Sequence, residues 1–368
     1  MAVTRIDVET FLSFGFKFPV FDVRSEGEFA HAHIPGAVSM PLFNNEERKV
    51  VGTAYKQQSK QQAIKIGMSI FGKKMVNMVE FVENVLGKIE SEPTKTIVVH
   101  CWRGGMRSGG VAWLLDLYGF KVYTIIGGYK AFRQWGMQQF EKEYPITILG
   151  GFTGSGKTYV LNALQQQKKV VIDLEALASH KGSAFGNIGM AAQPSQEMFE
   201  NQLALALRNA AVMLEKNKED VVNNKTISST IWLEDESQRI GLVNIPINFF
   251  KTMRNRPVYF LDIPFEERLK HIVSGYGKGD KQEIAAAIIR IQKRLGGLEA
   301  KTAINFLIED NLEDCFRILL KYYDKQYLKG LNSRPLLKEL LVKIECETVD
   351  AKENGKRIFT KQIEKIDV

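Results

Sequence analysis

The segment GFTGSGKT, residues 151–158, constrains the fold of this chain more than any other stretch. It matches the pattern GxxxxGK[ST], and it lies between the apolar run ITILG and the helix-like segment YVLNAL. Glycines in such a strand-to-helix turn let backbone N–H groups surround a phosphate at the positive end of the helix. The sequence therefore predicts a phosphate-binding loop in an α/β domain with a parallel sheet.

The group that this loop binds is diphosphate-like, and the motif reads no nucleotide base. Lys157 would neutralise phosphate charge. Asp173 ends the apolar run VVID, where it would either organise a metal ion or cap the following helix. The sequence leaves open whether a metal, with magnesium as the candidate, takes part. The residues predicted to bind the diphosphate are Gly151, Gly154, Ser155, Gly156, Lys157 and Thr158.

A second glycine-rich loop, HCWRGGMRS at residues 100–108, follows the apolar run TIVV and precedes the helix-like segment VAWLLDLYGF. Cys101 stands at the start of this turn, where backbone N–H groups and a helix N-terminus would favour a thiolate. Positive guanidinium groups nearby would lower the pKa of the thiol further. Cys101 is therefore the predicted nucleophile, and the predicted anion-binding residues are Arg103, Gly104, Gly105 and Arg107.

This loop by itself leaves two chemistries open. A thiolate in an anion cradle could attack phosphorus, or it could carry sulfur or selenium. The order His-Cys, five residues, Arg-Ser is also the signature of cysteine-dependent phosphatases, in which the arginine binds phosphate through two N–H groups.

Composition narrows the class of protein. With 368 residues, 45% of them apolar and 25% charged, the chain has a globular composition and room for two or three domains. No run approaches the roughly 20 apolar residues of a membrane span, and no signal peptide opens the chain, so we expect a cytoplasmic protein. Three cysteines without CxxC spacing argue against a disulfide framework and a structural zinc site. The formal charge of +8 favours an acidic partner such as nucleic acid.

Strand-like and helix-like segments alternate along the chain, which is typical of parallel α/β folds. Around residues 141–151 a charged helix end meets a proline and a new apolar strand begins, and we place a domain boundary there. Later strand candidates are VVID (170–173), TISSTIWLE (226–234) and VYFLDIP (258–264). The final sixty or so residues are rich in Leu, Lys and Tyr, and we expect them to form helices.

The segment DVRSEGEFAHAHIPGAVSMPL, residues 22–42, resembles the N-terminal motif of rhodanese domains, and VYTIIGGYKAFRQWG, residues 122–136, resembles their closing motif. Cys101 then falls where rhodaneses carry the cysteine that accepts sulfur or selenium. Five residues separate Cys101 from Arg107, whereas rhodanese loops commonly have four, and a longer loop suits a larger anion such as phosphate or selenophosphate. We therefore expect a rhodanese-like α/β sandwich in residues 1–140. A P-loop NTPase-like parallel-sheet domain with a helical C-terminal region follows in residues 146–368.

The combination of CWRGGMRS with GFTGSGKT, DLEALASHKGSAFG, QPSQ and EDESQRIG resembles the bacterial tRNA 2-selenouridine synthase family over nearly the whole chain. The resemblance implies replacement of sulfur by selenium in wobble 2-thiouridine of tRNA, with selenophosphate as donor. It also implies S-geranylation by geranyl diphosphate, whose diphosphate the loop at residues 151–158 would hold. Cys101 and Arg107 would then be catalytic in selenium delivery, and an enzyme that makes selenophosphate is a possible partner.

Three basic residues, Arg290, Lys293 and Arg294, fall on one stripe of a predicted helix, opposite an apolar stripe that contains Ile284, Ile288, Ile291 and Leu295. They are candidates for tRNA phosphate contacts, although such a stripe is also typical of a solvated helix face. Trp102 is a candidate for stacking on a flipped base or for packing. His100 and His180 are each either supporting hydrogen-bond partners or acid–base groups.

Three other functions fit parts of the sequence. The first is a phosphatase fused to a nucleotide-dependent domain, which would hydrolyse phosphate esters without tRNA. The second is a sulfurtransferase joined to a small-molecule kinase, which would turn over ATP through Lys157. The third is a tRNA-binding scaffold without activity, and the retained Cys101, Lys157 and Thr158 argue against it.

Overall fold

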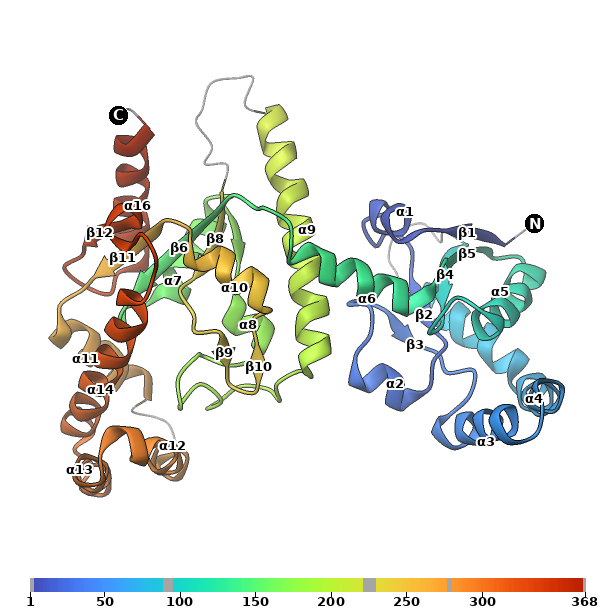
Figure 1. Ribbon diagram of the computed structural model, residues 1–368, viewed down its shortest axis with the longest axis horizontal. Helices are drawn as coiled ribbons and strands as arrows, with labels where there is room; N and C mark the ends of the chain where they lie inside the picture. Colours follow the sequence, from blue (N-terminus) through green and yellow to red (C-terminus); the bar gives the residue numbers. More distant parts are fainter. Residues whose placement is uncertain (1–2, 89–94, 221–229, 277–279, 367–368) are drawn as a thin grey trace. The chain divides into compact units, whose positions relative to one another are not determined.

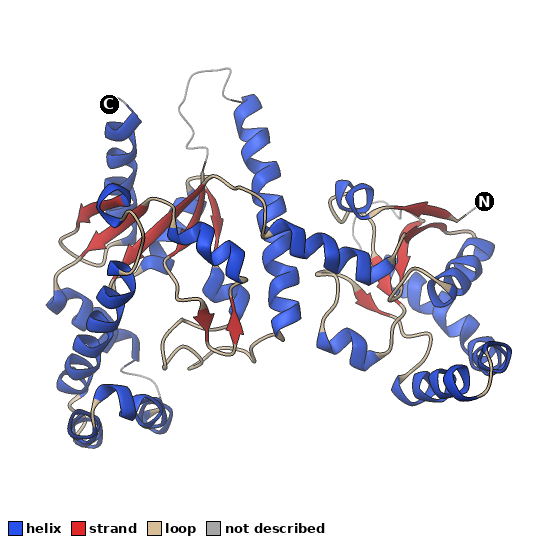
Figure 2. Ribbon diagram, viewed as in Figure 1, coloured by secondary structure: helices blue, strands red, loops and turns tan. Residues whose placement is uncertain are grey.

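The computed structural model describes residues 3–88, 95–220, 230–276 and 280–366 (Figures 1 and 2). The chain divides into two compact units, one of Met1–Gln139 with Glu200–Gln202 and one of Phe140–Phe199 with Leu203–Val368. Each unit has its own five-stranded sheet within the described residues, and every strand pairing in both sheets is parallel. The predicted α/β class with parallel sheets is confirmed.

The sheet of the first unit has the strand order β1-β5-β4-β2-β3. Its strands are β1 (Thr4–Ile6), β2 (Val20–Asp22), β3 (Val38–Ser39), β4 (Thr96–His100) and β5 (Lys121–Ile125). Its helices are α1 (Val8–Ser13), α2 (Glu26–His31), α3 (Asn45–Gln57), α4 (Lys60–Leu86), α5 (Met106–Tyr118) and α6 (Gly128–Gln139).

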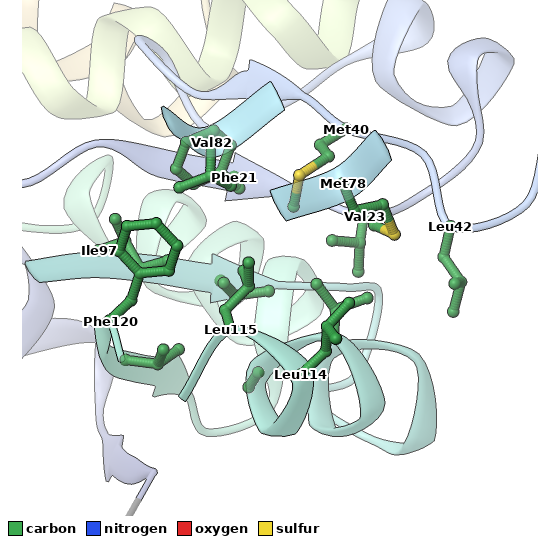
Figure 3. Packing of buried hydrophobic residues seen from close by; sticks show 14 of the residues in the cluster. Phe21, Val23, Met40, Leu42, Met78, Val82, Ile97, Leu114, Leu115 and Phe120 are labelled. Carbon is green, nitrogen blue, oxygen red and sulfur yellow. The ribbon is translucent and has the colours of Figure 1, made fainter. Parts of the chain in front are cut away.

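Both faces of this sheet are buried, which explains why its strands read as unbroken apolar runs. On one face, Phe21 and Ile97 pack with side chains of α4 and α5 such as Val82 and Leu115 (Figure 3). Val122 belongs to the same cluster. The alternate strand residues, including Val20 and Val98, are also buried. The neighbouring strands β2 and β4 bring their carboxyl ends side by side, since Asp22 is in register with His100. The cysteine loop begins at this edge.

The sheet of the second unit has the order β12-β11-β6-β8-β7. Its strands are β6 (Ile146–Gly151), β7 (Val170–Ile172), β8 (Ile231–Glu234), β11 (Val258–Asp262) and β12 (Leu341–Glu345), and a separate antiparallel pair is formed by β9 (Arg239–Ile240) and β10 (Val243–Asn244). The phosphate-loop strand β6 lies in the middle, flanked by β8 and β11. The loops after these strands therefore meet at one edge.

The helices of the second unit are α7 (Lys157–Gln166), α8 (Leu174–Ala178), α9 (Gln196–Asp220), α10 (Ile247–Arg254), α11 (Phe265–Tyr276), α12 (Lys281–Leu295), α13 (Gly297–Ile308), α14 (Leu312–Asn332), α15 (Leu337–Leu340) and α16 (Ala351–Ile366). Helices α11 to α14 share a core of buried apolar side chains that includes Leu269, Ile288, Ala303 and Phe316. Among the helices that the structure describes, none has the length and apolarity of a membrane span.

The C-terminal region is helical as predicted, with one exception. Residues 341–345 form β12, which pairs with β11 at the edge of the sheet. In this strand Val342 and Ile344 are buried and Lys343 is exposed, the alternation of a half-covered strand. The candidate strand at residues 226–234 is observed as β8 from Ile231 onward, and residues 226–229 lie outside the described part of the chain.

Candidate active site

The cysteine loop joins β4 to α5 and holds a buried thiol with a low pKa. Cys101 is 3% exposed, and its Sγ lies 3.2 Å from the Ser108 hydroxyl. Burial by itself raises the pKa of this thiol. Hydrogen bonds from the side chain and backbone N–H of Ser108, and from the N–H groups of Gly105 and Arg103, outweigh burial and lower the pKa below its ordinary value. This is the environment of a reactive thiolate.

The two arginines of the loop act differently from the prediction. The groups that lower the pKa of Cys101 are hydrogen-bond donors, among which Arg103 contributes its backbone N–H. The guanidinium of Arg107 donates to a Glu28 oxygen at 3.1 Å. Burial raises the pKa of Glu28, but the charge of Arg107 and hydrogen bonding from the Ser25 N–H outweigh it and lower this pKa. The Arg103 side chain is exposed and has no ion-pair partner among the described residues, so it remains open to an anion.

The closing segment at residues 125–130 clamps the cysteine loop through its backbone. The Tyr129 N–H donates to the Cys101 carbonyl at 2.9 Å, and the next N–H donates to the Trp102 carbonyl at 2.9 Å. Gly128 has φ +58°, and a Cβ there would lie 2.3 Å from the Cys101 carbonyl oxygen. Gly104 has φ +64°, and its Cβ would lie 2.4 Å from the Ile125 carbonyl oxygen. Both positions require glycine, because a side chain would strain the backbone and collide with backbone atoms.

A buried ion pair between Arg24 and Asp22 supports the cysteine loop. Arg24 donates to Asp22 through Nε at 2.9 Å and Nη2 at 2.6 Å, and its guanidinium lies 3.9 Å from the ring centroid of Tyr129. His100 Nε2 is 3.9 Å from Asp22 Oδ2. Burial lowers the pKa of His100 below its ordinary value despite this carboxylate, so the ring is neutral and supports the loop. Trp102 is 37% exposed, which leaves part of its ring available to a ligand.

The second predicted loop runs from the end of β6 to the start of α7. Gly151 ends the strand and Gly156 caps the helix. The ammonium group of Lys157 donates to the Gly151 carbonyl at 2.9 Å, and the Thr158 hydroxyl donates to Glu175 Oε2 at 3.2 Å. Ser155 Oγ is buried without a hydrogen-bond partner among the described residues, and Gly154 lies in the turn beside it. The structure thus brings all six predicted diphosphate-binding residues into one loop.

Residues far along the chain hold this loop in shape. Arg268 donates to the Thr153 carbonyl at 3.0 Å and makes a two-pronged ion pair with Asp324 at 2.9 and 2.8 Å. The Tyr327 hydroxyl accepts from the Gly151 N–H at 3.1 Å. Neither residue has a local sequence signal, because each is brought to the loop by α11 or α14.

A family model described as the tRNA 2-selenouridine synthase AAA domain matches residues 144–349, and a rhodanese-like domain model matches residues 12–134. The tRNA 2-selenouridine synthase of Bdellovibrio bacteriovorus is 33% identical over 358 residues, which cover 86% of this chain and 89% of that protein. The chain belongs to the tRNA 2-selenouridine synthase family.

Two proteins from Nitrosomonas, each a tRNA 2-selenouridine synthase, are also similar to this chain. The protein of Nitrosomonas eutropha is 32% identical over 86% of this chain and 89% of its own length. That of Nitrosomonas europaea is 37% identical over 263 residues, which cover 70% of this chain and 63% of that protein. A crystallised N-terminal domain from Clostridium difficile 630 is 38% identical over 36% of this chain and 98% of its own, with a TM-score of 0.32.

Asp173 has the capping role of the two that the sequence allowed. Its Oδ1 accepts from the Ala176 N–H at 2.7 Å, at the start of α8. Within the described residues, no group of three or more His, Cys, Asp or Glu side chains is arranged to hold a metal ion. The structure therefore shows the capping role, in which one carboxylate oxygen of Asp173 is engaged by the helix start.

Three glutamates beside the phosphate loop were not predicted as site residues. Glu175 accepts from Thr158, its own N–H donates to Glu234 Oε1 at 2.7 Å, and Glu236 shares a hydrogen bond with Glu175. These residues belong to the DLEALASHKGSAFG and EDESQRIG segments that carry the family resemblance. Sequence reasoning missed them because only the fold brings α8 and the end of β8 together.

Part of the basic stripe of α12 is engaged in hydrogen bonds within the protein. Arg290 donates to the Ala184 carbonyl at 3.0 Å and to Asn187 Oδ1 at 3.2 Å, so it ties down the loop before α9. Lys293 and Arg294 are exposed. On the opposite stripe Ile284, Ile288 and Ile291 are buried and Leu295 is half-buried. Two of the three basic candidates are therefore available to a phosphate. His180 lies outside both predicted loops, and burial lowers its pKa.

Proposed function

We propose that this chain replaces the sulfur of wobble 2-thiouridine in tRNA by selenium, with geranyl diphosphate and selenophosphate as co-substrates. The observation that carries the proposal is the presence, in one member of this family, of a thiol with a lowered pKa in one glycine-rich loop and of Lys157 in a second, separate glycine-rich loop. A single hydrolase or kinase site would need only one of them. Two anionic co-substrates used in sequence would need both.

The phosphate loop suits the first step, alkylation of sulfur. The backbone N–H groups around Gly154 and Gly156, together with Lys157 and Thr158, would bind the diphosphate as it leaves the geranyl group. The contact between Lys157 and the Gly151 carbonyl would be exchanged for a phosphate oxygen. Alkylation converts the sulfur into a better leaving group for the step that follows. No residue is assigned to magnesium.

The cysteine loop suits the second step, delivery of selenium. Selenophosphate is an anion that the N–H groups of Gly104 and Gly105 and the exposed guanidinium of Arg103 would hold. Arg107 keeps N–H donors beyond the one used by Glu28, so it can also face the anion. The Cys101 thiolate lies at the base of this cradle, where it would assist selenium transfer.

The tRNA would be attracted by the positive charge of the chain, which is +8. Lys293 and Arg294 are the candidates for phosphate contacts on α12, and the exposed part of Trp102 is the candidate for stacking on the modified base. An enzyme that produces selenophosphate would supply the second co-substrate.

The test is mass spectrometry of nucleosides from a tRNA that contains 2-thiouridine, incubated with geranyl diphosphate and then with selenophosphate. The wild type is expected to form geranylthiouridine and then selenouridine. Lys157→Ala should lose the first product, and Cys101→Ser should lose only the second. Cys315→Ser is the matched control, since Cys315 lies in the helical core. If neither the wild type nor any variant changes the uridine, the proposal fails. Hydrolysis of phosphate esters and of ATP would then be assayed.

A further inference from the structure

The carboxyl groups of Glu175 and Glu236 form a hydrogen-bonded pair at the phosphate loop, and the binding roles given above do not use them. Glu175 is linked to the loop through the Thr158 hydroxyl at 3.2 Å. Two carboxyl groups can share a hydrogen bond only if one of them carries a proton. The pair is therefore a reservoir that holds one proton and can accept a second.

Burial and the charges around the pair favour its protonated form. Burial and the neighbouring carboxyls raise the pKa of Glu236 well above its ordinary value, and burial also raises that of Glu175. The groups that face the pair are Lys157, Asp173, Glu234 and Asp235. Of these, Lys157 favours the charged form and the three acids oppose it.

The surrounding chain is built to admit this pair. Gly182 has φ +67°, and a Cβ there would lie 2.6 Å from Glu236 Oε2, so the absence of a side chain leaves space for the carboxyl group. Glu234 is 3% exposed, and its Oε2 has no hydrogen-bond partner among the described residues. Its other oxygen accepts from the Glu175 N–H, which places this unpartnered oxygen beside the pair. A buried carboxyl oxygen without a protein partner is open to a polar partner such as a bound ligand or a water molecule.

We propose that the Glu175–Glu236 pair accepts the proton that the thiouridine base loses when its sulfur is alkylated beside the phosphate loop. The inference rests on the proposed function. In this step the S–C bond to the geranyl group forms as the C–O bond to the diphosphate breaks. The ring N3–H proton passes to Glu236, and the proton of Glu236 passes to Glu175. The diphosphate leaves with the electron pair of the C–O bond, beside Lys157.

Proton transfer gives the Glu175–Glu236 pair a role in the alkylation step, in addition to the binding roles of the phosphate loop. Loss of the N3 proton puts negative charge on the sulfur and makes it a better nucleophile. Two ionised carboxylates next to a bound diphosphate would repel it with two negative charges, whereas a pair that already holds one proton carries a single negative charge. General base groups of this kind contribute about 100- to 10,000-fold to rate.

The first experiment measures the geranylation rate of 2-thiouridine tRNA against pH for the wild type, Glu236→Gln and the exposed control Glu339→Gln. Wild-type activity is expected to fall as pH drops through the pKa of the pair, because the pair is then fully protonated. Glu236→Gln should lower the maximal rate by about 100-fold or more. The acidic limb of the pH–rate profile of Glu236→Gln should move to lower pH, because the pKa of Glu175 falls when the like charge that faces it is removed. Glu339→Gln should match the wild type.

A second measurement is calorimetric binding of inorganic diphosphate to the same proteins. Glu236→Gln should bind it as well as the wild type does. Glu236→Asp, which keeps the charge on a shorter side chain, should recover part of the rate, and it serves as the test variant if the glutamine protein loses diphosphate binding. Any one of four results would overturn the inference. They are retained geranylation activity in Glu236→Gln, an unmoved acidic limb of its pH–rate profile, loss of diphosphate binding in both variants, and restoration of the rate by added magnesium. If the wild type does not geranylate tRNA, the proposed function falls as well.

Discussion

Replacing Ser108 by alanine removes the hydroxyl that lies 3.2 Å from the Cys101 sulfur and leaves the backbone donors in place. A hydrogen bond to a charged group contributes about 1.5 to 3 kcal/mol. One pKa unit corresponds to about 1.4 kcal/mol. The Cys101 pKa should therefore rise by about 1 to 2 in Ser108→Ala. Below both pKa values the thiolate fraction should fall by about 10- to 100-fold.

The assay is the rate of iodoacetamide labelling of each cysteine against pH, followed by peptide mass spectrometry. Cys315 and Cys346 are internal controls, because burial raises the pKa of each to about 11. Arg103→Gln is the matched variant, because its exposed charge should change the Cys101 pKa by less than about 0.7. At high pH, Ser108→Ala and wild type should react equally fast. An unchanged pKa in Ser108→Ala, or a larger rise in Arg103→Gln, would refute the assignment of the thiolate to hydrogen bonding.

Two further predictions concern the supports of the loops. Gly128→Ala forces a side chain into a left-handed backbone position at 2.3 Å from the Cys101 carbonyl oxygen, which should cost about 2 kcal/mol or more. Hydrogen exchange of the cysteine-loop peptide should then be about 30-fold faster, and an unchanged exchange rate would contradict the clamp. Arg268→Ala leaves Asp324 unpaired and the Thr153 carbonyl without its donor, at a cost of about 3 to 5 kcal/mol. The calorimetric unfolding temperature of Arg268→Ala should fall and its diphosphate binding should weaken. Arg268→Lys should have an intermediate unfolding temperature. Equal unfolding temperatures for the wild type and both variants would show that the Arg268–Asp324 pair is dispensable.

Both glycine-rich loops could be predicted from the sequence because their information is local. A strand, a glycine turn and a helix that follow one another in the chain determine where the backbone N–H groups point. The positions of Cys101, Lys157 and Thr158 within those turns needed no knowledge of distant residues. The parallel class of each sheet was also predictable, because buried strands read as unbroken apolar runs.

Only the tertiary structure decided what surrounds each loop. Arg107 was expected to lower the pKa of the thiol, yet one N–H group of its guanidinium donates to Glu28, 79 residues earlier in the chain. Arg290 was a candidate for tRNA contact, yet it holds the loop before α9. In each case the local pattern showed a charge but not its partner. The partner depends on which elements the fold packs together.

The glutamates beside the phosphate loop show the same division most clearly. The sequence by itself placed two glycine-rich loops and their candidate residues and predicted the alternation of strands and helices, since these depend on neighbours in the chain. The fold brought Glu175 from α8 and Glu236 from beyond β8 to one proton-sharing pair, although 59 residues separate the Glu175 N–H from its acceptor on Glu234. The pKa of a carboxyl group depends on burial and on charges within a few ångströms. Distance in space sets both, and sequence separation does not reveal it.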